Sequence, residues 1–145
     1  MKAVMLGALV VAASATHSRA QALCADLKDI VSIFGTRDLS KLKSRRIVGM
    51  SSGCMIVEGG KTHLYDCAQT LSSRDAAVAR AKEIETAIEQ CFPQAKPHRT
   101  SAPDTSTVTN YFGVDPRISK ISVSTKFEFV IKNDFDVEIA VEGFW

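Results

Sequence analysis

The sequence lacks an excess of charge of either sign and lacks any long hydrophobic run. Its 145 residues include 18 basic and 16 acidic side chains. Nucleic-acid binding needs basic residues in excess on one face, so this balance argues against a nucleic-acid partner. The longest apolar stretch covers residues 3–13, whereas a membrane-spanning helix needs roughly 20 residues. We therefore expect no nucleic acid as partner and no transmembrane segment in the mature chain.

The sequence also lacks the short motifs that hold metals, phosphates or catalytic nucleophiles. No two cysteines are separated by only two residues, and no two histidines have the spacing of a metal-binding pair. Zinc sites depend on such close ligand pairs. There is no P-loop, no G-x-S-x-G and no H-E-x-x-H. The sequence therefore predicts no metal, no cofactor and no catalytic residue.

The N-terminus has the layout of a secretory signal peptide. Lys2 supplies a positive end, residues 3–13 are apolar or small, and small residues suited to cleavage follow near Ala20 and Ala22. We expect residues 1–22 to be the signal and residues 23–145 to form one domain in the periplasm or outside the cell. Without Lys2 and Arg19, 16 basic residues face 16 acidic ones. A lipid on Cys24 is disfavoured because the preceding residue is a leucine rather than a small residue.

Two segments have the apolar periodicity of helices. Residues 24–34 form the first, and Gly35 follows as a stop signal. The second begins after Ser72 or Ser73, has Asp75 in its first turn, and ends at Phe92-Pro93. Its apolar stripe is Ala77, Ala81, Ile84, Ile88 and Cys91.

Two hairpins are expected around the second helix. Residues 47–57 and 62–69 predict the first, with Gly59-Gly60 as its turn because paired glycines accept positive φ. This turn places Cys67 one diagonal step from Cys54, so that a slight bulge brings the sulfurs into range. Alternation over residues 121–131 and 137–141 predicts the second, with a three-residue turn at 133–135 that sets Phe127 opposite Val141. Residues 94–106 have the composition of a surface loop, and residues 108–112 are a candidate for an additional strand.

An even number of cysteines in an exported protein predicts two disulfides. The second helix is roughly 27 Å long, so it carries Cys91 away from Cys67. If the two helices are antiparallel, the start of the first meets the end of the second. We therefore prefer Cys24–Cys91 with Cys54–Cys67, and Cys24–Cys67 with Cys54–Cys91 is the alternative.

The order of the elements predicts an α+β fold in which two helices pack on one face of an antiparallel sheet. The order is α-β-β-α-β-β, with one extra strand if residues 108–112 pair. Cys24, Cys54, the Leu64-Tyr65-Asp66-Cys67 strand and the Cys91-Phe92-Pro93 helix end resemble those of small exported four-cysteine proteobacterial proteins. The element order is similar to the type III secretion chaperone-like fold, including YbjN-like proteins. This resemblance implies a non-catalytic protein that binds other proteins.

We expect a protein-binding module, such as an adaptor, an inhibitor or an immunity-type partner. Its interface is expected at exposed edges of the final strands, with Phe135, Phe144 and Trp145. A homodimer through edge strands is a second form of the same hypothesis.

Two alternatives come from other classes of function. A small periplasmic hydrolase would use His63 with Ser51 or Ser52 and Asp66, although Asp66 lies on the opposite strand face. An anion or envelope-surface binder would use the basic connector, residues 36–46, through Arg37, Lys41, Lys43, Arg45 and Arg46. We favour a solvated loop, with Leu39 and Leu42 reaching the core, for this connector.

Overall fold

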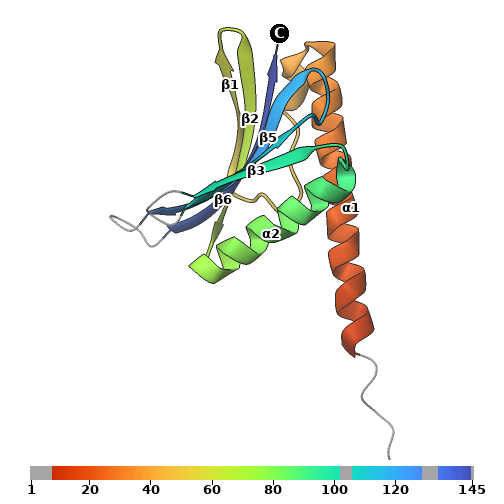
Figure 1. Ribbon diagram of the computed structural model, residues 1–145, viewed down its shortest axis with the longest axis vertical. Helices are drawn as coiled ribbons and strands as arrows, with labels where there is room; N and C mark the ends of the chain where they lie inside the picture. Colours follow the sequence, from red (N-terminus) through yellow and green to blue (C-terminus); the bar gives the residue numbers. More distant parts are fainter. Residues whose placement is uncertain (1–7, 102–105, 129–133, 145) are drawn as a thin grey trace, which may run out of the picture.

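The computed structural model describes residues 8–101, 106–128 and 134–144 and has a two-layer α+β fold (Figure 1). Within these residues the elements are α1 (Ala8–Thr36), η1 (Leu39–Leu42), β1 (Gly53–Gly59), β2 (Thr62–Leu71), α2 (Arg74–Cys91), β3 (Lys96–Ser101), β4 (Thr107–Phe112), β5 (Ile118–Glu128) and β6 (Asp134–Phe144). All strands are antiparallel to their neighbours in one sheet of order β1-β2-β6-β5-β4-β3. The predicted fold class is confirmed. The candidate strand at residues 108–112 is present as β4, whereas β3 was not predicted.

Both helices cover the same face of the sheet. α2 lies across β2, β6 and β5, and α1 packs beside α2 and reaches β6. The core between the two layers includes Leu27 and Phe34 from α1, Ile84 and Ile88 from α2, and Tyr65, Val123 and Ile139 from the sheet. In the described part of the chain, no helix covers the opposite face, which is called the uncovered face below.

α1 is longer than the helix predicted at residues 24–34. It passes without a break through both predicted cleavage positions. Its C-terminal part is buried against the rest of the fold, whereas its N-terminal part projects beyond the molecule (Figure 1). Over the residues that the structure describes, no helix combines the length and the apolar character needed to span a membrane.

α2 begins and ends where the sequence predicts. The hydroxyl oxygen of Ser73 accepts a hydrogen bond from the Ala76 N–H at 3.1 Å, and Asp75 lies in the first turn. The helix ends at Cys91, before Phe92. The predicted stripe of Ala77, Ala81, Ile84, Ile88 and Cys91 is buried.

The first hairpin has a different register from the predicted one. Its turn is Gly60-Lys61, because Gly59 is still paired with Thr62 and the positive φ of 60° belongs to Gly60. This shift places Cys54 directly opposite Cys67, and the two are disulfide-bonded without a bulge in the ladder. β1 also begins at Gly53 rather than at residue 47, since residues 47–52 form turns.

The second disulfide joins Cys24 in α1 to Cys91 at the end of α2, with 5.4 Å between the Cα atoms. The end of α2 therefore meets α1 at Cys24, in the middle of the longer helix, and α2 crosses α1 obliquely instead of running antiparallel beside it (Figure 1). The preferred pairing of the four cysteines is confirmed, and the alternative pairing is wrong.

Two predictions about the C-terminal half are also wrong. Residues 96–101 form β3 instead of a loop, but all six side chains are exposed, so the strand carries no apolar alternation. In the second hairpin Phe127 pairs with Phe135 and not with Val141. Phe135 is thus part of β6 rather than of a turn, and the predicted strand residues 129–131 lie outside the described residues.

Charged side chains from both helices hold the segment that leads to β1. Asp26 in α1 accepts a hydrogen bond from the Val48 N–H at 2.8 Å, and Arg80 in α2 donates to the Val48 carbonyl oxygen at 3.2 Å. Arg80 is buried and also donates to Gln69 Oε1 and Glu83 Oε2, each at 3.1 Å. This clamp joins α1, α2 and β2 to the start of the first hairpin.

Candidate binding surface

The uncovered face presents a row of side chains that crosses the whole sheet. The strand registers place Met55, Asp66, Ala140, Ser122, Asn110 and His98 side by side in this order. Side chains alternate between the faces of a strand, and the next residues along the chain, such as Tyr65 and Tyr111, are buried toward the helices. The row therefore lies on the face that the helices leave open.

Charged side chains of opposite sign occupy the middle of this face. Lys126 Nζ lies 2.6 Å from Glu138 Oε2, and Lys120 Nζ lies 3.3 Å from Glu142 Oε2. Burial raises the pKa of Asp66, and the negative charge of Glu138 raises it further, while Lys126 acts in the opposite direction. Lysines thus balance the acidic side of β6, and the centre of the face is a mixed-charge network.

The edge of the sheet at β1 is apolar. β1 is the terminal strand and pairs with β2 alone among the described strands. On the uncovered face, Met55 is 59% exposed and Val57 is 46% exposed. The run from Cys54 to Val57 is apolar on both faces, which is typical of a central strand rather than of an edge. This mismatch between composition and position marks the β1 edge as the candidate binding surface.

The opposite edge, β3, is protected against pairing with another chain. It contains Lys96, Pro97 and Arg99, and all of its side chains are exposed. Lysine and proline on an edge strand hinder the addition of a further strand. β1 carries one charged residue, Glu58, and no proline. Of the two edges, β1 is therefore the one suited to strand addition.

The interface predicted at the final strands is not on an edge. β6 lies between β2 and β5 in the middle of the sheet. Phe144 is 53% exposed at the end of β6. Phe135 is half-buried, with its ring centroid 6.0 Å from that of Phe127. Trp145 lies outside the described residues.

The residues of the hydrolase hypothesis are not brought together. His63 lies opposite Glu58 and Gly143, near the turn of the first hairpin. Ser52 accepts a hydrogen bond from the Thr70 N–H at 3.0 Å, and Thr70 is about 23 Å along β2 from His63. Ser51 is next to Ser52 in the exposed turn before β1. Asp66 is on the uncovered face, whereas His63 is on the other, so the chain offers no Ser-His-Asp geometry here.

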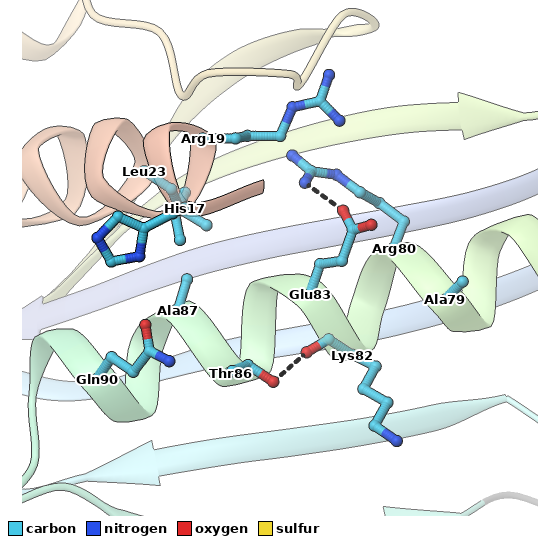
Figure 2. A pocket seen from close by; sticks show the side chains of 11 residues that line it. His17, Arg19, Leu23, Ala79, Arg80, Lys82, Glu83, Thr86, Ala87 and Gln90 are labelled. Atoms are coloured by element: carbon cyan, nitrogen blue, oxygen red, sulfur yellow. Dashed lines mark hydrogen bonds and ion pairs between the residues drawn. The ribbon is translucent and has the colours of Figure 1, made fainter. Parts of the chain in front are cut away.

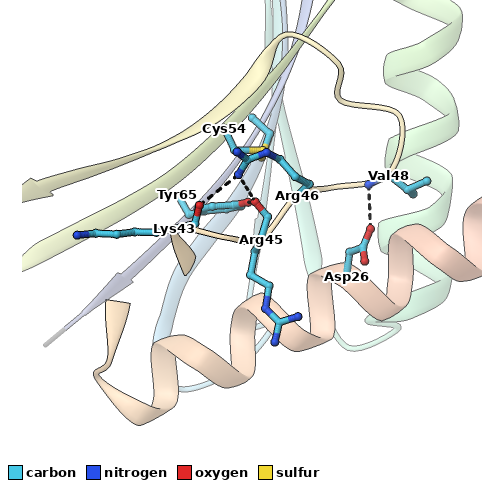
Figure 3. Close-up of a disulfide and its surroundings, with 8 residues drawn as sticks. Asp26, Lys43, Arg45, Arg46, Val48, Cys54 and Tyr65 are labelled. Carbon is cyan, nitrogen blue, oxygen red and sulfur yellow. Dashed lines mark hydrogen bonds between the residues drawn. A yellow bond between two sulfur atoms is a disulfide. The ribbon is translucent and has the colours of Figure 1, made fainter. Parts of the chain in front are cut away.

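The basic connector is exposed, and Leu42 within it is buried as predicted. Its five cations are Arg37, Lys41, Lys43, Arg45 and Arg46. Two of them have acidic partners, since Lys41 lies 3.5 Å from Asp38 and Arg45 lies 3.0 Å from Asp29. The hydroxyl of Tyr65 donates to the Arg45 carbonyl oxygen at 2.8 Å, which anchors the connector beneath the first hairpin (Figure 3).

A groove of about 830 Å³ lies between the N-terminal part of α1 and α2 (Figure 2). Its α1 wall is His17, Arg19, Ala20 and Leu23, and its α2 wall includes Arg80, Glu83 and Gln90. Cleavage at either predicted position would remove most of the α1 wall. Because the groove depends on residues that the predicted cleavage would remove, we take the β1 edge as the candidate binding surface.

Over the described residues, no three His, Cys, Asp or Glu side chains are grouped so that they could hold a metal ion. The β1 edge was not predicted, and the signal in the sequence that could have indicated it is the four-residue apolar run Cys54–Val57 next to an exposed turn. Comparison of the chain with protein-family models, with curated proteins and with solved structures finds no match.

Proposed function

We propose that the protein is an exported, non-catalytic protein-binding module that docks its partner on the β1 edge and the adjoining part of the uncovered face. The observation that carries the proposal is that β1 is apolar on both faces yet ends the sheet, with Met55 and Val57 exposed. Such an edge is a template for an extended segment of another chain. The backbone of that segment continues the ladder, and its side chains contact the apolar residues beside it.

Export is supported by the cysteines and by the N-terminal sequence. Both disulfides tie separate elements together, and disulfides form and persist in oxidising compartments such as the periplasm. Lys2 followed by the apolar residues 3–13 has the layout of a secretory signal. The resemblance to the secretion chaperone-like fold supports a protein partner, by analogy of fold.

The test is a comparison of two valine variants. Val57→Lys puts a charge on the β1 edge, and Val78→Lys puts the same charge on α2 at a position with the same exposed fraction of 46%. The immobilised variants are incubated with exported proteins of the same organism, and the bound proteins are identified by mass spectrometry. We expect Val78→Lys to retain the proteins that the wild type binds and Val57→Lys to lose them.

Each contrary result has a definite meaning. If both variants recover the same proteins, the docking surface is not at β1. If the wild type recovers no specific protein, protein binding itself is the wrong function. Circular dichroism of the variants checks that both are folded.

A further inference from the structure

We infer that the partner of the β1 edge is a second copy of this chain, paired antiparallel through β1 about Ile56. The inference rests on the proposed function, because it takes β1 as the docking edge and names the occupant. It follows from three properties of the strand: the direction of its backbone groups, the register they allow, and the side chains that then meet.

The hairpin fixes which backbone groups of β1 face the free edge. In an antiparallel ladder, pairs that exchange two hydrogen bonds alternate with pairs that exchange none, and the latter have the shorter Cα separation. The Cα atoms of Cys54 and Cys67 are 4.0 Å apart, which identifies a pair without hydrogen bonds. Cys54 and, by alternation, Ile56 and Glu58 therefore direct their N–H and C=O groups away from β2. These groups point to the free edge.

A second β1 pairs most completely when the two Ile56 residues lie opposite each other. In this register every residue from Gly53 to Gly59 has a counterpart in the other copy. The outward-facing residues of one strand meet those of the other, which gives about six backbone hydrogen bonds. A shift by one residue would match outward-facing groups with inward-facing ones, and a shift by two would shorten the ladder.

The side chains agree with this register. On the uncovered face, Met55 of each copy lies opposite Val57 of the other, in a pair whose side chains come close because the backbones exchange no hydrogen bonds. The single charge of the strand, Glu58, lies opposite Cys54 and not opposite itself, so the symmetry brings no like charges together.

Self-pairing accounts for the contrast between the two edges. The β3 edge carries the lysine and proline that keep strands from adding, and the β1 edge has an apolar sequence that is complementary to itself. A two-fold axis through the Ile56 pair is perpendicular to the sheet. The dimer is thus one continuous sheet, with the helices of both copies on one side and the two uncovered faces joined on the other.

The test exploits the Met55–Val57 contact. Met55→Glu and Val57→Lys are made singly and together, and Val78→Lys is the control; the molar mass of each is measured by light scattering and sedimentation over a concentration series. We expect a wild-type dimer that the control retains. Each single variant should raise the dimer dissociation constant about tenfold or more, because it buries a charge against an apolar side chain. The double variant should restore the dimer, since charges of opposite sign then face each other across the axis.

Three results would overturn the inference. One is a wild-type chain that stays monomeric throughout the series; if Val57→Lys still loses captured proteins in that case, the proposed function stands and only the second copy is excluded. Another is a dimer that survives both single variants, since its contact would lie elsewhere. The third is a double variant that remains monomeric, because the register about Ile56 would then be wrong.

Discussion

Removal of the two disulfides one at a time should destabilise the protein by unequal amounts. The cysteines are 67 residues apart in the Cys24–Cys91 bond and 13 residues apart in the Cys54–Cys67 bond. A cross-link limits the unfolded chain more strongly when it closes a longer loop. The loop-entropy relation gives about 4.4 kcal/mol for the longer loop and about 2.9 kcal/mol for the shorter one at 25 °C.

The measurement is urea denaturation of two variants in which both cysteines of one bond are replaced by alanine, so that no free thiol is left to exchange. Cys67 and Cys91 are both buried, so each variant also loses packed sulfur, and the loop length remains the main difference. We expect the variant without Cys24–Cys91 to be less stable than the other by about 1.5 kcal/mol. Equal losses, or a larger loss without Cys54–Cys67, would refute the reasoning from loop length.

Two further predictions concern buried or half-buried charges. Arg80→Met removes the donors to the Val48 carbonyl oxygen and to Gln69. We expect the free energy of unfolding, measured by urea denaturation, to fall by about 2–4 kcal/mol. Lys82→Met, on the exposed side of α2, is the control, and an equal fall in both variants would show that the hydrogen bonds of Arg80 contribute nothing to stability. The raised pKa of Asp66 means that the folded state favours the protonated acid, so its stability falls as the pH rises from the ordinary value of 3.8 through the folded pKa. Asp66→Asn should therefore be more stable than the wild type at neutral pH, and thermal denaturation should show the difference vanish at low pH; a difference independent of pH would contradict this.

The elements that the sequence predicts well are those that local rules determine. α2 has a serine cap, an acidic first turn, an uninterrupted apolar stripe and a proline after its end, and each of these signals acts within a few residues. The pairing of Cys24 with Cys91 could also be predicted, because the length of α2 fixes where Cys91 lies. In both cases the prediction depends on the residues and the length of a single helix, and both can be read directly from the sequence.

The hairpin registers could not be predicted in the same way. Gly59 and Gly60 both accept a positive φ, so the sequence does not determine which of them opens the turn, and the turn sets every pair along the strands. In the same way, Phe135 has the alternation of a strand whether the turn ends before it or after it. β3 was missed because an exposed edge strand buries none of its side chains, and its pairing with β4 depends on the backbone.

The location of the proposed binding surface depends on the order of the strands, which is a property of the whole sheet. Nothing in the Cys54–Val57 run says that β1 ends the sheet, and nothing in β6 says that it lies in the centre. The alternation of Val137, Ile139 and Val141 is the same in a central strand and in an edge strand with one buried face. For this reason the sequence predicted the interface at the final strands, whereas we propose it at β1, the strand at the edge of the sheet.

The central place of β6 has a consequence for the order in which the protein folds. β6 pairs with β2 on one side and with β5 on the other, and it is the strand that joins them. Until residues 134–144 are synthesised, β1–β2 and β3–β4–β5 can form only as two separate small sheets. A single core can therefore form only after β6 has been added to the two small sheets. The late steps of folding thus depend on contacts between residues far apart in the sequence. Such an order is compatible with the export proposed above, in which the chain would complete its fold and its disulfides only after translocation.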